Sequence, residues 1–102
     1  METSERRLVH VLHPADNVAT ALVEIPSGTT VAVEQEGQRS IVVVSTAIPF
    51  GHKLAQSAIS RGQPVIKYGE VIGLATQDIA PGEHVHVHNV ESQRGRGDLA
   101  RP

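Results

Sequence analysis

The stretch that decides the fold is residues 29–45, TTVAVEQEGQRSIVVVS. Two runs rich in β-branched residues, 29–34 and 40–45, flank the polar, glycine-containing segment 35–39. β-branched side chains favour strands, and a short polar segment with glycine is typical of a hairpin loop. The sequence therefore predicts an antiparallel β-hairpin here.

The composition of the whole chain also favours strands in one small domain. The 102 residues include one Phe, one Tyr and no Trp, so the core must be aliphatic. The net charge of -2, with acids and bases interspersed, gives no broad basic surface for nucleic acid. No run resembles a signal peptide or a membrane span, and there is no cysteine. We expect a cytoplasmic protein with a disordered start (1–7), a folded domain (8–91) and a flexible tail (92–102).

Other segments predict further short elements. Residues 64–67 and 71–75 flank a Tyr-Gly-Glu turn and predict a second hairpin, and residues 8–12 predict a first strand. Residues 18–23, which follow a capping aspartate, and residues 54–58 are expected to form short helical turns. The predicted fold class is mainly β, with short irregular strands and one or two short helical turns.

A spaced pattern, Ala-x-x-x-Ile-x-x-Gly-x-x-Val, occurs three times along the chain. We expect its isoleucine to be buried in the core, its glycine to form a turn and its valine to begin the next strand. The spacing between copies is unequal, which excludes a solenoid of fixed period and indicates a small, heavily folded β module. The copies are Ala21/Ile25/Gly28/Val31, Ala55/Ile59/Gly62/Val65 and Ala75/Ile79/Gly82/Val85.

The chemistry is concentrated in residues 82–89, GEHVHVHN. An extended strand would place the three histidines on one face and the two valines on the other. Imidazoles two residues apart, roughly 6.6 Å along a strand, can lean onto one divalent cation or one anion. Asp16, His52 and Glu83 are candidates for a further ligand; the alternative is an exposed strand face without a ligand. The histidines are His84, His86 and His88, and the valines are Val85 and Val87.

Two turns place a lysine beside glycine. They are Gly51-His52-Lys53 and Lys67-Tyr68-Gly69, where backbone amides and positive charge could together hold a carboxylate. The alternative is that these are ordinary solvated lysines. We interpret His10 and His13, near the end of the first predicted strand, as structural.

Four motifs together resemble the N-terminal module of the altronate and galactarate dehydratase family. They are DNVA (16–19), IPFGHK (48–53), KYGEVIG (67–73) and GEHVHVHN (82–89), and the resemblance covers residues 8–91. Related small subunits occur in sulfolactate sulfo-lyases. The resemblance implies an SAF-type β-clip domain and a lyase that removes water, or sulfite in the sulfolactate branch, from a hydroxy acid.

The resemblance also implies site residues and a divalent metal, Fe²⁺, Mn²⁺ or Mg²⁺, held with or by a large subunit. The catalytic candidates are His52, Lys53, His86 and His88. The substrate-binding candidates are Lys67, Tyr68, Gly69, Asn89, Asp16 and Asn17. The metal-binding candidates are His86, His88 and, less directly matched to the family motif, His84.

Because family enzymes carry a much larger second domain, we expect this chain to act as a small subunit that completes an active site with a large dehydratase subunit. The substrate would then be a sugar acid. The alternatives are a non-catalytic module that binds sugar acids or other anionic carbohydrates, the small subunit of a sulfolactate sulfo-lyase, and a metal-binding structural protein. Association into a homo-oligomer stays open.

Overall fold

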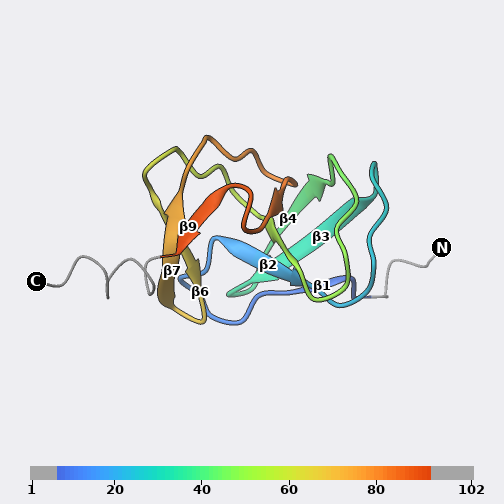
Figure 1. Cartoon of the computed structure of the whole chain (residues 1–102). Coiled ribbons are helices and arrows are strands. Elements are labelled where there is room, and N and C mark those ends of the chain that lie inside the picture. Colours follow the sequence, from blue (N-terminus) through green and yellow to red (C-terminus); the bar gives the residue numbers. More distant parts are fainter. Residues whose placement is uncertain (1–6, 93–102) are drawn as a thin grey trace, which may run out of the picture.

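The computed structural model describes residues 7–92, and within them the chain forms nine short strands and no helix (Figure 1). The prediction of a mainly β fold with short strands is confirmed. The predicted disordered start and flexible tail lie almost wholly outside the described residues. No helix that could span a membrane occurs among residues 7–92. The strands are β1 (Val9–His10), β2 (Val18–Ala21), β3 (Thr30–Gln35), β4 (Gln38–Val43), β5 (Lys53–Ala55), β6 (Pro64–Lys67), β7 (Glu70–Ala75), β8 (His84–Val85) and β9 (Val90–Ser92).

Both predicted hairpins are present. Strands β3 and β4 pair in register from Thr30↔Val43 to Gln35↔Gln38, so the loop is two residues long, shorter than the five expected. Strands β6 and β7 likewise flank a two-residue turn, Tyr68-Gly69. All four turn residues have positive φ, as the turns that suit the right-handed twist of hairpins require.

The predicted helical turns at 18–23 and 54–58 are wrong. Strands β2 and β5 occupy these segments and pair with each other inside a four-stranded sheet of order β1-β2-β5-β8. Ala19 and Leu54, opposite each other, are both fully buried. A short apolar run has little intrinsic helical stability, and pairing with a distant segment decides its conformation.

The first strand is shorter than predicted. Strand β1 covers only Val9–His10, because the chain then leaves the sheet for a turn in which the Asp16 amide donates to the His13 carbonyl. Figure 1 shows the β3–β4 hairpin on one side of the domain and strands β6, β7 and β9 on the other, with β2 between them.

Within residues 7–92, the turn of the repeated Ala-x-x-x-Ile-x-x-Gly-x-x-Val pattern, whose isoleucine forms an isolated β-bridge, occurs four times, once more than the sequence pattern predicted. The additional copy starts at Val44 and ends at Leu54, where the other copies have alanine and valine. Its Ile48 is fully buried and its Gly51 has φ 84°, close to φ 86° at Gly28 in the first copy. Residues 21–54 and 55–85 are therefore two similar halves, each made of turn, hairpin and turn.

Within each half the two turns bind each other reciprocally. Ile25 and Ile48 exchange amide-to-carbonyl hydrogen bonds of 2.9 and 2.8 Å, and Ile59 and Ile79 do the same in the second half. The turn glycine of each copy donates to the residue that opens its partner copy, as Gly82 does to Ala55 at 2.7 Å. The repeated sequence thus satisfies its own turn amides, which need partners when they are buried.

The aliphatic core follows the same division. One cluster gathers the isoleucines of the first half, Ile25 and Ile48, and a second cluster gathers those of the second half, Ile59 and Ile79. The halves meet where β5 of the first pairs antiparallel with β8 of the second. The residues that follow Gly51 and Gly82 are therefore brought together at the seam between the halves.

Candidate functional site

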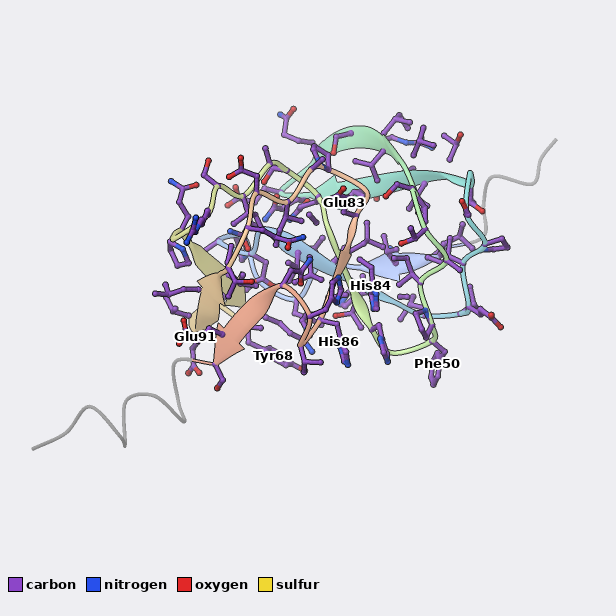
Figure 2. The ribbon with its side chains drawn as sticks, turned by 45° about the horizontal axis from the view of Figure 1, so that its top comes forward. Phe50, Tyr68, Glu83, His84, His86 and Glu91 are labelled. Carbon is purple, nitrogen blue, oxygen red and sulfur yellow. The ribbon has the colours of Figure 1, made fainter. Side chains whose placement is uncertain are left out.

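Three imidazoles meet at this seam: His52, His84 and His86. One ring nitrogen of each lies within 4.8 Å of the others. The Nδ1 atom of His52 is 2.9 Å from the Nε2 atom of His84, and the His52 and His86 rings stack with centroids 4.1 Å apart. We call these residues the histidine cluster. Figure 2 labels His84 and His86 on the face where it lies.

The pairing of β5 with β8 explains how the histidine cluster forms. Leu54 lies opposite His84 and Lys53 opposite Val85, so the turn before β5 lies beside β8. The amide of His52 donates to the Pro49 carbonyl at 3.0 Å and closes that turn. His52 is therefore held against His84 although 32 residues separate them in sequence.

The expected alternation of histidines and valines along one strand is wrong. Strand β8 ends at Val85, and the chain turns through residues 86–89. Val85 is buried as expected, but Val87 is 82% exposed. The turn nevertheless keeps His84 and His86 on the same side, with ring centroids 5.4 Å apart.

Asn89 fixes this turn. Its Oδ1 atom accepts from the His86 amide at 3.0 Å, and its Nδ2 atom donates to the His84 carbonyl at 2.9 Å. Asn89 was expected to contact substrate, but its side chain is only 1% exposed and both of its polar atoms are engaged by backbone. Its position suits it to hold the two histidines.

The other ligand candidates lie outside the histidine cluster. The exposed ring of His88 stacks at a tilt on His84 with centroids 5.2 Å apart. A Glu83 carboxylate oxygen accepts from the Ala80 amide at 2.9 Å, and an Asp16 oxygen accepts from the Gly69 amide at 2.9 Å. Of the three further ligands that the sequence offered, the structure brings only His52 to the group.

Burial disfavours the protonated forms of His84 and His86, and the neighbouring charges that act on them are positive. Burial first, and then the positive charges of neighbouring histidines and Lys53, lower the pKa of His84 from 6.5 to about 4. The same causes lower the pKa of His86. The pKa of Lys53 is lowered by its own burial and then by the charge of Lys67. Among the described residues, the neighbouring charges that act on these three groups are positive, which favours an anion. The neutral ring nitrogens of His84 and His86 are the form that binds a metal.

The β6–β7 hairpin brings Lys67 and Tyr68 to the same region. The Lys67 Nζ atom lies 5.9 Å from the Tyr68 ring centroid, and Tyr68 is 66% exposed. Asp16 and Asn17, expected to bind substrate, also brace this hairpin. Asp16 binds the Gly69 amide, and Asn17 accepts from the Ile66 amide at 2.8 Å.

A cavity of about 150 Å³ adjoins the histidine cluster. It joins the end of the first hairpin to the turns of the second half. Hydroxyl, amide and carboxylate groups line this cavity. No sequence motif pointed to Ser45, Thr46 or Gln77, which supply the hydroxyl groups and one of the amides. The lining consists of Ser45, Thr46, Gln77, Glu83, His84, His88 and Asn89.

Comparison with known proteins identifies the family. A family model described as "Altronate/galactarate dehydratase SAF domain" matches residues 7–93. The chain belongs to this family. The resemblance drawn from the four motifs is thereby confirmed, and the short-stranded architecture of residues 7–92 agrees with the predicted SAF-type β-clip.

Relatives of this SAF domain are lyases of two kinds. It is 43% identical over 81 residues to the altronate dehydratase of Escherichia coli and 38% identical to that of Bacillus subtilis. These alignments cover 79% of the chain but only 16% of each dehydratase. The SAF domain is also 41% identical over 88 residues to the (2R)-sulfolactate sulfo-lyase subunit alpha of Chromohalobacter salexigens, covering 82% of this chain and 94% of that subunit.

Proposed function

We propose that this SAF domain is the small subunit of a sugar-acid dehydratase and completes a metal-dependent active site with a larger catalytic subunit. The observation that carries the proposal is the histidine cluster, with Lys53 and Lys67 beside it. The relatives support the reaction class, because altronate dehydratase eliminates water and one further relative is named as a subunit of a sulfo-lyase.

The residues present fit a divalent metal. His52, His84 and His86 each offer a ring nitrogen, and the lowered pKa values of His84 and His86 keep their rings neutral, the form that binds metal. The Nδ1 atom of His86 is buried without a hydrogen-bond partner. An all-imidazole set suits Fe²⁺ better than Mg²⁺, which prefers oxygen ligands. A bound metal would act as a Lewis acid towards substrate oxygens.

The two lysines account for recognition and proton transfer. The positive charge of Lys67 attracts the substrate carboxylate and stabilises the negative charge that develops when the proton α to the carboxylate is removed. Lys53 is the side chain that we assign to accept this proton, because its lowered pKa enlarges the neutral fraction that can act as a base. The groups that assist the departing hydroxyl would come from the large subunit.

The adjoining cavity favours a polyhydroxylated substrate. Ser45, Thr46 and Gln77 offer hydroxyl and amide groups that can hydrogen-bond the hydroxyls of a sugar acid. The second candidate, a sulfolactate sulfo-lyase subunit, is favoured by the alignment that covers 94% of subunit alpha of that enzyme.

The test is turnover by the chain together with its candidate large subunit. Dehydration of altronate and galactarate, and sulfite release from sulfolactate, would be measured with Fe²⁺, Mn²⁺ or Mg²⁺. We expect sugar-acid dehydration only in the complex, and its loss in His86→Ala but not in His10→Ala, which alters an exposed histidine of β1.

Three outcomes would change the assignment. Sulfite release without dehydration would assign the second candidate. Sugar-acid binding by the chain alone, with no turnover in any complex, would indicate a binding module. If Thr46→Val and Gln77→Leu leave the ratio of activities on a six-carbon and a three-carbon hydroxy acid unchanged, the cavity does not select the substrate.

A further inference from the structure

Among the described residues, the three most exposed large apolar side chains lie close in sequence to the histidine cluster or to Lys67. Phe50 is 71% exposed, Tyr68 is 66% exposed and Val87 is 82% exposed. Phe50 lies two residues before His52, Tyr68 follows Lys67 directly, and Val87 lies between His86 and His88. Figure 2 shows Phe50 and Tyr68 along one edge of the view, with His86 between them. We call Phe50, Tyr68 and Val87 the apolar rim.

Two features argue that the apolar rim is an interface. Phe50 and Tyr68 are the only phenylalanine and tyrosine in the chain. Both side chains are exposed to solvent, although aromatic residues are usually buried in the core. Tyr68 also has φ 59°, a conformation unfavourable for a bulky residue, where asparagine or glycine is usual. The hairpin turn holds Tyr68 in this conformation with its ring exposed, which points to a role in binding.

The three side chains are presented by rigid turns. Asn89 holds the turn that carries Val87, the His52–Pro49 hydrogen bond closes the turn that carries Phe50, and Asp16 holds the turn that carries Tyr68. Preorganised apolar groups lose little conformational entropy when they bind a partner, and tyrosine is common among the residues that dominate binding energy.

Charge decides between the candidate occupants. Lys67 directly precedes Tyr68, its Nζ atom lies 5.9 Å from the Tyr68 ring centroid, and its positive charge acts on Lys53. A second copy would bring the same positive groups face to face about a two-fold axis. A partner that carries carboxylates would neutralise them. In the altronate dehydratases the matching segment is 16% of the chain, so most of the enzyme lies outside it.

We propose that the apolar rim is the docking surface for the larger catalytic subunit, which presents an apolar surface to Phe50, Tyr68 and Val87 and carboxylates to Lys53 and Lys67. This inference rests on the proposed function for the identity of the partner. Docking here closes the histidine cluster from bulk water and strengthens the electrostatic interactions inside it.

The test measures affinity for the purified candidate large subunit by calorimetry. The altered chain carries Phe50→Ser, Tyr68→Asn and Val87→Ser together, and the matched control carries Ile41→Ser and Val43→Ser. Ile41 and Val43 are 58% and 56% exposed on β4, in the other hairpin. We expect the dissociation constant to rise at least about 100-fold in the triple variant and less than about 2-fold in the control.

A folding control separates lost contacts from lost structure. Tyr68→Asn places a residue that tolerates positive φ in the turn, so it should keep or raise the urea midpoint while weakening binding about 10-fold. Raising the salt concentration should weaken the wild-type complex. Equal effects of the triple variant and its control, or self-association lost only in the triple variant, would overturn the proposal.

The readouts also distinguish this inference from the proposed function. A wild-type complex that is weakened by the triple variant but eliminates nothing from altronate, galactarate or sulfolactate would overturn the function and leave the docking surface standing. Absence of any complex with the wild-type chain, or full turnover with the triple variant at limiting subunit concentration, would overturn the docking surface.

Discussion

The Nδ1 atom of His52 lies 2.9 Å from the Nε2 atom of His84, although the two residues belong to different halves of the domain. Two ring nitrogens this close can share one proton or bind one metal ion. His86 adds a third nitrogen within 4.8 Å. The arrangement depends on the pairing of β5 with β8 and exists only in the folded chain.

Loss of any one cluster histidine should therefore abolish tight metal binding. We expect His52→Ala, His84→Ala and His86→Ala each to weaken Fe²⁺ or Mn²⁺ binding by about 100-fold or more, because removing a ligand should cost at least as much as removing a group that orients one. His88→Ala should weaken it far less. Anaerobic calorimetry on the isolated chain measures this, with His10→Ala as control. Equal losses in His88→Ala and His84→Ala would contradict the three-histidine assignment.

The stability of the metal-free chain should fall as the pH falls from about 6.5 to about 4. Burial lowers the pKa of His84 to about 4 in the folded chain, whereas the unfolded chain keeps an ordinary value of 6.5. Between these values the unfolded state binds more protons, so acidification favours unfolding, and the effect ends below about pH 4. His86 acts in the same direction.

Urea unfolding with a chelator at several pH values measures this dependence. His84→Gln removes one titrating group, so its urea midpoint should change less between pH 6.5 and 4 than that of the wild type. An identical pH dependence in both proteins would show that His84 titrates normally in the folded chain.

The parts of the fold that depend on neighbouring residues could be predicted from the sequence. Both hairpins follow from β-branched runs around a turn, and both are present. The segments at 18–23 and 54–58 were misassigned, because pairing between strands 30 or more residues apart decides their conformation. The fourth repeated turn escaped the pattern because Val44 and Leu54 replace its alanine and valine.

The candidate site could likewise be predicted only in part from the sequence. The sequence showed the histidine-rich segment. The predicted strand with histidines on one face and valines on the other does not form, because the hydrogen bonds of Asn89 hold a turn after Val85. His52 was one candidate among three, and only the meeting of the two halves selects it. Ser45, Thr46 and Gln77 carry no motif, and tertiary structure alone brings them to the cavity.

Removal of the Asn89 side chain should weaken both the fold and the metal site. Asn89→Ala leaves the His86 amide and the His84 carbonyl without their partner, which should cost about 2–3 kcal/mol of unfolding free energy. Metal affinity should fall about 10- to 100-fold, since the turn no longer fixes His86.

Asn89→Asp provides the matched control, because it keeps the acceptor for the His86 amide but loses the donor to the His84 carbonyl. Urea unfolding and metal titration compare the variants. A direct contact with substrate would instead leave stability and metal affinity unchanged and raise KM alone.

The last prediction compares two glycines of the repeated turn that differ in what surrounds them. Gly28 and Gly82 have φ 86° and 89°, so alanine at either position adopts an unfavourable backbone conformation, at about 1–2 kcal/mol. A Cβ at Gly28 meets nothing within 4 Å, but a Cβ at Gly82 would overlap the Val43 carbonyl oxygen. Gly82→Ala must also separate β8 from the Ser45 amide, which donates to the Gly82 carbonyl at 3.2 Å.

We expect Gly82→Ala to lower the unfolding free energy by at least about 2 kcal/mol more than Gly28→Ala and to weaken metal binding, because His84 follows Gly82 by two residues. Urea unfolding of the two variants measures the difference. Equal destabilisation would mean that the backbone conformation alone requires glycine at these positions and that the approach of Val43 does not contribute.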